Sequence, residues 1–308
     1  AEFALSRIKK GYLYITNQLN KKLTIECSTT HGNDSIRFTK DNLKISLKPL
    51  ETKKIAVSLK QPELKSVNHK YAQFIFSHNG QQVASLKKYI DLTPVYKANT
   101  KDKKVTFNIQ EMGNVYPADA IPAGLWTGND DLSIKAWLTY DKDNFYFTAE
   151  VTDDSHCQKR TGPDIWMNDS FQIGFDMKAD ALDPIFNNKS GYDSNDIELG
   201  IALTPKGPQV FSWQHPTDKY QNQPIPCPLS IKKISANKLL YKLTVPCKLL
   251  NISSIAPGQI IGFTFNCLDS EKGETVSYWM GPSEGIIQGK DPSKFKKLIF
   301  LNSGISNK

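Results

Sequence analysis

The feature that most constrains this chain is the alternation of apolar and polar residues with a period of two. In residues 43–47 and 55–59, leucine, isoleucine or valine stands at every second position. Such alternation is typical of strands with one buried face, because successive side chains of a strand point to opposite sides. Helical periodicity is weak throughout. The sequence therefore predicts an all-β protein built from two β-sandwich domains.

The strands fall into two groups. Residues 11–92 contain five to seven short runs, a hairpin signal at residues 78–81 (HNGQ) and a turn at residues 48–54 (KPLETKK). This pattern predicts a small antiparallel sandwich that resembles immunoglobulin- and fibronectin-like accessory domains. Residues 93–104, TPVYKANTKDKK, are polar and basic and contain a proline, so we predict a linker there.

After the linker the strands become longer and more aromatic, which predicts a larger β-sandwich over residues 105–302. Residues 1–10 and 303–308 are interpreted as tails. No run approaches the 18 to 20 apolar residues, roughly, that a membrane span needs, so we expect no membrane span. The net charge is +8, but the lysines are scattered along the chain, and we expect no nucleic-acid partner.

The cysteines argue against a structural zinc site, because the sequence contains no CxxC and no Cys/His pair at zinc-finger spacing. Their number is odd, which leaves at least one free thiol, and the sequence does not choose between buried thiols and disulfides. The five cysteines are Cys27, Cys157, Cys227, Cys247 and Cys267.

One stretch combines an aromatic, an amide and a strand in a way that suits a sugar ligand. In IWMNDSFQIGFD (165–176), Trp166, Asn168 and Gln172 offer a ring face and planar hydrogen-bonding groups. Proteins bind sugars by placing aromatic faces against the C–H face of the ring and polar groups on the hydroxyls. Trp213 and Trp279 are further aromatic candidates near strand ends. Packing in the core is the alternative for each tryptophan.

Four ordered motifs carry a resemblance to a known family. They are AWLTYDKDNFYFTAEVTDDSH (136–156), IWMNDSFQIGFD (165–176), IIGFTFNCLDSEKGE (260–274) and DPSKFKKLIFL (291–301). Residues 105–301 thereby resemble a family 9 carbohydrate-binding module of the DOMON-like group. The resemblance implies a β-sandwich that binds sugar between two tryptophans.

The match to the family's sugar site is incomplete. Trp166 stands where the family places one tryptophan, but Gly289 occupies the place of the other. Gln172 replaces a glutamate of the family pattern, and Gly200 lies about where an arginine is expected. We therefore expect weak sugar binding, with Trp213 or Trp279 as the candidate for the second aromatic.

Acidic residues end two strands, in VTDDSH (151–156) and NCLDSEKGE (266–274). Oxygen ligands from two adjacent loops suit calcium, which takes six to eight of them. The family resemblance also implies structural calcium, and Asp153, Asp154 and Asp269 are the candidate ligands. Solvated acidic turns are the alternative.

The sequence therefore predicts a non-catalytic carbohydrate-binding module with an accessory sandwich domain. We expect it to be extracellular, periplasmic or on the cell surface, to bind polysaccharide, and to belong to a longer polysaccharide-processing chain. No nucleophile elbow, phosphate-binding loop or HExxH motif is present. The alternative is a structural or protein-interaction spacer. Haem binding and a catalytic role are less favoured, because the methionines and His156 show no haem pattern.

Overall fold

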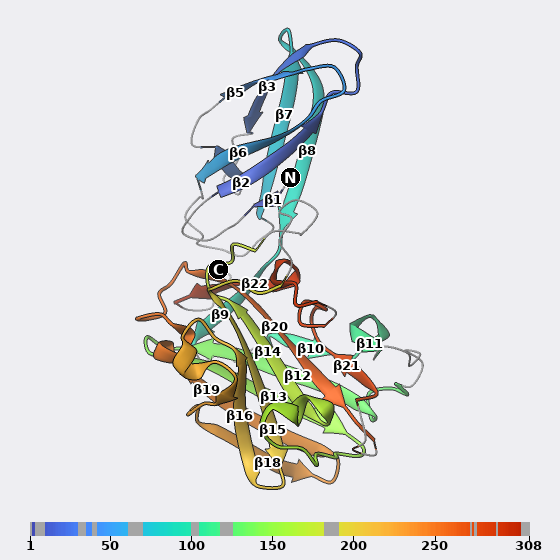
Figure 1. Ribbon diagram of the computed structural model, residues 1–308, viewed down its shortest axis with the longest axis vertical. Coiled ribbons are helices and arrows are strands. Elements are labelled where there is room, and N and C mark those ends of the chain that lie inside the picture. Colours follow the sequence, from blue (N-terminus) through green and yellow to red (C-terminus); the bar gives the residue numbers. More distant parts are fainter. Residues whose placement is uncertain are drawn as a thin grey trace, which may run out of the picture. The chain divides into compact units, whose positions relative to one another are not determined.

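The computed structural model of the protein describes residues 2–3, 10–29, 35–38, 42–60, 70–99, 105–117, 126–181, 191–271, 273, 276–287 and 289–302. The chain divides into two compact units: the smaller comprises Ala1–Leu92 and Ala179–Asn187, and the larger comprises Thr93–Lys178 and Asn188–Lys308. Strands supply nearly all of the regular structure in the described residues, and the helices there are short 3₁₀ turns. The all-β prediction is confirmed (Figure 1).

The smaller unit is one network of paired strands with the order β1-β2-β6-β4-β7-β3-β5, and β8 pairs with β7. Strand β4 pairs antiparallel with β6 and parallel with β7, so it connects the two groups of strands. The strands are β1 (Glu2–Phe3), β2 (Lys10–Thr16), β3 (Leu23–Thr29), β4 (Ser35–Phe38), β5 (Asn42–Leu47), β6 (Thr52–Lys60), β7 (Lys70–His78) and β8 (Gln81–Ile90).

Both predicted turns of this unit are present. Asn79 and Gly80 join β7 to β8 with φ values of 50° and 78°, the positive angles that a tight primed turn requires. Leu50, at φ 56°, lies in the turn between β5 and β6. The alternation also has the expected effect, since Ile45, Leu47 and Val57 are buried. The resemblance to immunoglobulin- and fibronectin-like domains stays a prediction.

The larger unit is built from longer strands in the order β17-β16-β15-β14-β20-β22-β9-β12-β13-β19-β18. Off this path, β10 pairs with β12, and β21 pairs with β11 and β20. The strands are β9 (Leu92–Lys97), β10 (Phe107–Ile109), β11 (Val115–Pro117), β12 (Leu132–Tyr140), β13 (Asn144–Asp153), β14 (Ser170–Asp176), β15 (Asp196–Thr204), β16 (Gly207–Gln214), β17 (Gln223–Pro224), β18 (Leu229–Ser235), β19 (Lys238–Pro246), β20 (Ile260–Asp269), β21 (Tyr278–Met280) and β22 (Lys296–Leu301).

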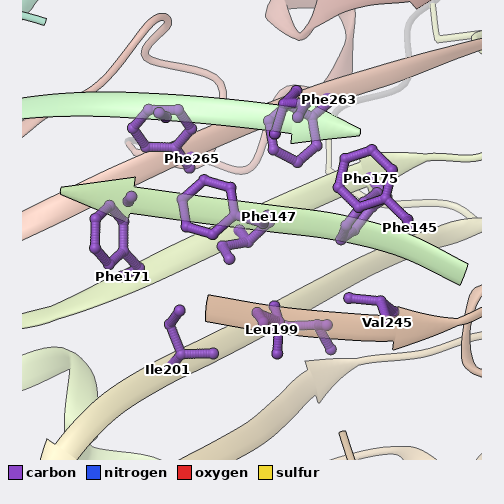
Figure 2. Packing of buried hydrophobic residues seen from close by; sticks show 14 of the residues in the cluster. Phe145, Phe147, Phe171, Phe175, Leu199, Ile201, Val245, Phe263 and Phe265 are labelled. Carbon is purple, nitrogen blue, oxygen red and sulfur yellow. The ribbon is translucent and has the colours of Figure 1, made fainter. Parts of the chain in front are cut away.

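The core of this unit lies between two layers of strands. Phe145 and Phe147 on β13 face Phe171 and Phe175 on β14, and the facing rings meet edge to face with centroids 5.4 and 5.5 Å apart (Figure 2). Phe265 on β20 joins them, 5.4 Å from Phe147. Edge-to-face contacts suit the aromatic quadrupole, and each buried ring removes a large apolar area from water. This packing fixes the face of β14 that points outward.

The predicted linker at 93–104 is wrong at its start. Residues 92–97 form β9, which pairs in parallel with β12, with Tyr96 opposite Thr139. Pro94 and the polar, basic composition favoured a linker, but β9 lies beside β22 and β12, where tertiary pairing decides the structure. Residues 100–104 lie outside the described residues.

The five cysteines are free, and all except Cys157 are buried. The sequence leaves open whether the cysteines are thiols or disulfides, and the structure shows that they are thiols. In the described part of the chain, no helix is long and apolar enough to cross a membrane.

Candidate ligand-binding site

The site begins in the 3₁₀ turn η3 (Gly162–Met167), just ahead of β14. Gly162 has a φ of 67°, and Pro163 follows it in the first turn of η3. Within this short turn, Ile165 is fully buried while Trp166 is 41% exposed. Of the two alternatives for Trp166, a ligand-facing ring and packing in the core, the structure excludes the core, because the side chain lies at the surface.

A pocket of about 460 Å³ opens beside Trp166 on the outer face of the β14 layer. Three tryptophans line it together with an amide, a carboxylate and an ammonium group. Its lining residues are Trp166, Gln172, Glu198, Trp213, Trp279, Ile286, Ile287, Gly289 and Lys290. Four of the five predicted ligand-binding residues therefore meet in one place, although they come from η3, β14, β16 and β21.

Gln172 is directed into this pocket by the alternation of β14. Phe171 and Ile173 on either side of it are fully buried in the core, because successive side chains of a strand point to opposite faces. Gln172 itself is only 8% exposed. Its neighbour on the same face, Gly174, is covered by Phe295 and Ile286, so that a Cβ there would lie 2.6 Å from the ring of Phe295. The outer face of β14 is therefore a pocket wall and not an open surface.

Trp213 lies across Gly200, the position where the family pattern places an arginine. A Cβ on Gly200 would lie 2.2 Å from the indole ring of Trp213 and 2.9 Å from Ile165. The indole Nε1 donates a hydrogen bond of 2.9 Å to the carbonyl of Pro163. The absence of a side chain at Gly200 is thus the condition that lets Trp213 reach the pocket, and the same contacts tie Trp213 to η3.

A buried carboxylate and a lysine form the polar end of the pocket. Glu198 on β15 is 2% exposed, and Lys290 Nζ lies 2.7 Å from its Oε1. Glu198 stands opposite Gly174 on β14, two residues from Gly200, and so shares the outer face with Gln172. Lys290 follows Gly289, whose φ of 106° favours glycine. The loop thereby brings an ammonium group into the pocket beside Gly289, the position where the family pattern has its second tryptophan.

Asn168, the fifth predicted ligand residue, does not line the pocket. It is fully buried. Its Oδ1 accepts a 3.1 Å hydrogen bond from the backbone N–H of Lys159, and its Nδ2 donates to the carbonyl of Met167 and to Ser270 Oγ. The prediction is wrong for this residue, because the amide satisfies backbone groups where η3 ends.

A larger hollow of about 710 Å³ lies on the outer face of the other layer. Tyr96, Trp137 and Tyr146 line it, with threonines and Lys242. Trp137 alternates with the buried Ala136 and Leu138, which explains why it points outward. Among the described residues, this hollow is lined by one tryptophan and no carboxylate, so the smaller pocket offers the better match to a polar ligand with one apolar face.

A second cluster of polar side chains lies where β13 and β20 end. The predicted metal residues meet there, but they divide between two groups. Asp153 groups with His156 and Asp169, and Asp154 groups with Asp131 and Glu271, the ligand atoms of each group lying within 4.8 Å of one another. Asp269 is 3% exposed and its Oδ2 has no hydrogen-bond partner among the described residues.

Burial and neighbouring charges shift the pKa values of several groups in this cluster. Burial raises the pKa of Asp269 to about 9, and the carboxylates of Asp169 and Asp153 add to the rise. Burial also raises the pKa of Asp169 to about 6, although His156 opposes this. His156 Nδ1 lies 3.3 Å from one oxygen each of Asp153 and Asp169. Burial lowers the pKa of His156, but these two carboxylates outweigh it and raise the value to about 9.

The donor set fits calcium better than a softer metal. The group of Asp131, Asp154 and Glu271 offers oxygen ligands alone. Asp269 adds a buried oxygen that has no hydrogen-bond partner among the described residues, and the charges of Asp131 and Glu271 help to raise its pKa. Like-charged carboxylates in a buried cluster favour an added cation.

Five of these residues are not among the predicted ligands: Asp131, Asp169 and Glu271 in the acidic cluster, and Glu198 and Lys290 in the pocket. One signal was available for Glu198, since a charged residue in the apolar run DIELGIAL stands on the same face of its strand as Gly200. No comparable signal marks Lys290, because a loop brings it to β15 from 92 residues away in sequence.

The fold and the pocket together define a class, namely a β-sandwich domain with an aromatic ligand pocket on one outer face. The particular family follows from the sequence, because residues 90–202 match the family described as "Carbohydrate family 9 binding domain-like". This match over residues 90–202 confirms the resemblance seen in the motifs. The match starts at the end of the smaller unit and includes β9.

Two solved structures are similar to this chain. One is a family 9 carbohydrate-binding module from Caldicellulosiruptor kristjanssonii in complex with cellotriose, at 15% identity and a TM-score of 0.45, covering 70% of this chain and 97% of that one. The other is a family 9 module from the same organism in complex with glucose, at 15% identity and a TM-score of 0.46, covering 69% and 98%. No curated protein matches this chain significantly.

Proposed function

We propose that the larger unit is a non-catalytic module that binds a carbohydrate in the pocket beside Trp166. The observation that supports this most is the convergence of three tryptophans with Gln172, Glu198 and Lys290 around about 460 Å³. A sugar ring has an apolar C–H face and a rim of hydroxyls, which is the complement of such a pocket. The family match over residues 90–202 supports the same assignment.

Each side chain has a distinct part in this proposal. Trp166, which is 41% exposed, offers its ring face to the sugar, and Trp279 offers a second aromatic contact. Gln172 donates and accepts hydrogen bonds with hydroxyls, Glu198 accepts and Lys290 donates. With Gly289 where the family pattern has its second tryptophan, we expect a dissociation constant on the order of 0.1–1 mM, or about 4–6 kcal/mol.

A glycan array followed by titration calorimetry tests the proposal, with glucose and cellotriose included because the two similar modules hold them. Trp166→Ala should weaken binding at least tenfold, roughly the loss of one stacked aromatic, and shift the melting temperature little. Trp137→Ala, on the opposite layer, is the matched control and should leave binding intact. A blank array together with a protein captured by pull-down would instead favour the alternative, a protein-interaction spacer.

We further propose that the protein works outside the cytoplasm, as the binding part of a polysaccharide-processing chain in which the smaller unit is a spacer. Sugar binding without a catalytic constellation supports this context. Fractionation of the native cells with an antibody against the chain tests it, and a signal restricted to the cytoplasm would contradict it.

The acidic cluster supports one more proposal, that calcium stabilises the larger unit. Asp153, Asp154 and Asp269 remain the proposed ligands, now joined by Asp131, Asp169 and Glu271. Calcium would supply the positive charge that offsets the repulsion of these carboxylates. Equilibrium dialysis with elemental analysis tests this directly, and absence of bound calcium at millimolar concentration would refute it.

A further inference from the structure

The positive charge of this protein is concentrated in one of its two units. Residues 1–92 contain sixteen lysines and arginines against seven aspartates and glutamates, whereas residues 93–308 contain twenty-three against twenty-four. Residues 1–92 therefore carry a net charge of +9, and residues 93–308 carry −1. Such asymmetry between two parts of a chain indicates a charged partner for one of them.

The lysines of the smaller unit are on its surface. All eight whose side chains the structure describes are exposed: Lys21, Lys22, Lys44, Lys48, Lys53, Lys54, Lys87 and Lys88. Protection of sheet edges accounts for lysines on an edge strand such as β8. On β6, Lys53 and Lys54 pair with Ile15 and Tyr14 of β2, and the pairing of β6 with β4 covers only residues 59 and 60.

Aromatic rings accompany the lysines on two faces. Lys54 Nζ lies 4.3 Å from the ring centroid of Tyr12 and 5.6 Å from that of Tyr14, and the register places Tyr14 directly opposite Lys54. On β7 and β8, Lys87 Nζ lies 4.1 Å from the ring centroid of Tyr71. Each place therefore combines an ammonium group with an aromatic face.

We propose that the smaller unit binds an anionic polysaccharide, with the Tyr12–Tyr14–Lys54 and Tyr71–Lys87 faces as its contacts. A carboxylated or sulfated sugar offers an anion to the lysines and a C–H face to the tyrosines. A polysaccharide is favoured over other polyanions because the same chain carries a carbohydrate family 9 domain. Two sugar-binding units on one chain also strengthen attachment to one polymer through effective concentration.

The experiment measures binding of the full chain to sodium polygalacturonate and to dextran sulfate by biolayer interferometry, at salt concentrations from about 50 to 500 mM. Affinity should fall steeply with salt, because polyanion binding releases counterions. The quadruple variant Lys53→Gln, Lys54→Gln, Lys87→Gln, Lys88→Gln should lose about tenfold in affinity at the lowest salt and show a shallower salt dependence.

Two controls separate this proposal from its competitors. The variant Lys206→Gln, Lys232→Gln, Lys233→Gln, Lys296→Gln removes the same charge from exposed positions of the larger unit and should change affinity less than twofold. Trp166→Ala should leave polyanion binding intact, so failure of the sugar pocket would not affect this result. Circular dichroism and melting curves confirm that each variant is folded.

Three outcomes would overturn the proposal. The first is an equal loss of affinity in both quadruple variants, which would mean that only net charge matters. The second is tighter binding to double-stranded DNA of matched charge, which would assign a nucleic acid. The third is tighter binding to phosphatidylserine vesicles than to either polysaccharide, which would assign a membrane surface.

Discussion

Single side chains set the polarity of the pocket, and the pair of Glu198 and Lys290 can be tested without removing an aromatic. Lys290→Ala leaves the carboxylate of Glu198, which is 2% exposed, without its cation. A buried charged group that loses its partner costs about 1–3 kcal/mol, so the free energy of unfolding should fall by about that amount in urea titrations.

The double variant Glu198→Gln with Lys290→Ala is the matched control for this prediction. It removes the uncompensated charge and should recover most of the lost stability. A single variant as stable as the parent would show that solvent already compensates Glu198.

The cysteines give a second prediction at this scale. Burial raises the pKa of Cys27 and of Cys227 to about 12. A thiol reagent at pH 8 should therefore modify Cys157, the one cysteine that is not buried, and should reach the other four only in denaturant. Mass spectrometry after brief labelling checks this, and rapid labelling of Cys27 in the native protein would contradict it.

The raised pKa values of Cys27 and Cys227 also make the stability of the folded protein depend on pH. The two thiols keep their protons in the folded state, while the unfolded chain loses them near the ordinary value of 9.0. Stability should therefore be unaffected by these groups below about pH 9 and should fall as the pH rises from about 9 toward 12.

At the scale of elements, the outer face of β15 decides whether the pocket exists. Gly200→Ala places a Cβ against the ring of Trp213, within 2.2 Å in the present arrangement. We expect a loss of about 1–3 kcal/mol from overpacking, with weaker sugar binding because Trp213 must move away. Gly113→Ala, where no atom lies within 4 Å of the new Cβ, is the control and should be close to neutral.

Thermal unfolding and titration of the same samples would measure both effects. A Gly200→Ala variant with parental stability and parental affinity would mean that Trp213 shifts freely and that its contact with η3 is unimportant.

At the scale of the whole molecule, the acidic cluster brings the ends of β13 and β20 together with the residues that precede β12 and β14. A cation that binds the folded state alone stabilises it by about 2.7 kcal/mol at a hundredfold excess over its dissociation constant. Millimolar calcium should therefore raise the melting temperature of the larger unit by roughly 5–10 °C, and EDTA should reverse this. Magnesium should do less, because it requires a tighter octahedral shell.

Asp153→Asn combined with Asp269→Asn should abolish the calcium effect, because it removes two of the proposed carboxylate ligands. Melting curves that overlay in calcium and in EDTA would leave these loops as ordinary acidic turns.

Local pattern alone determined the strand content, the hairpin at Asn79 and Gly80, and the inward faces of strands such as Phe171, Ile173 and Phe175. These features depend on alternation and on turn chemistry, which adjacent residues encode. The same pattern pointed to Trp166 and Gln172, because both belong to one short segment.

Tertiary structure alone decided the rest. It made residues 92–97 a strand, withdrew Asn168 from the site, and brought Lys290 to Glu198 across 92 residues. It also joined Asp131, Asp169 and Glu271 to the predicted acidic residues. The physical reason is that strand pairing and loop placement depend on partners distant in sequence, and the partner of a side chain is fixed only when the sheets pack.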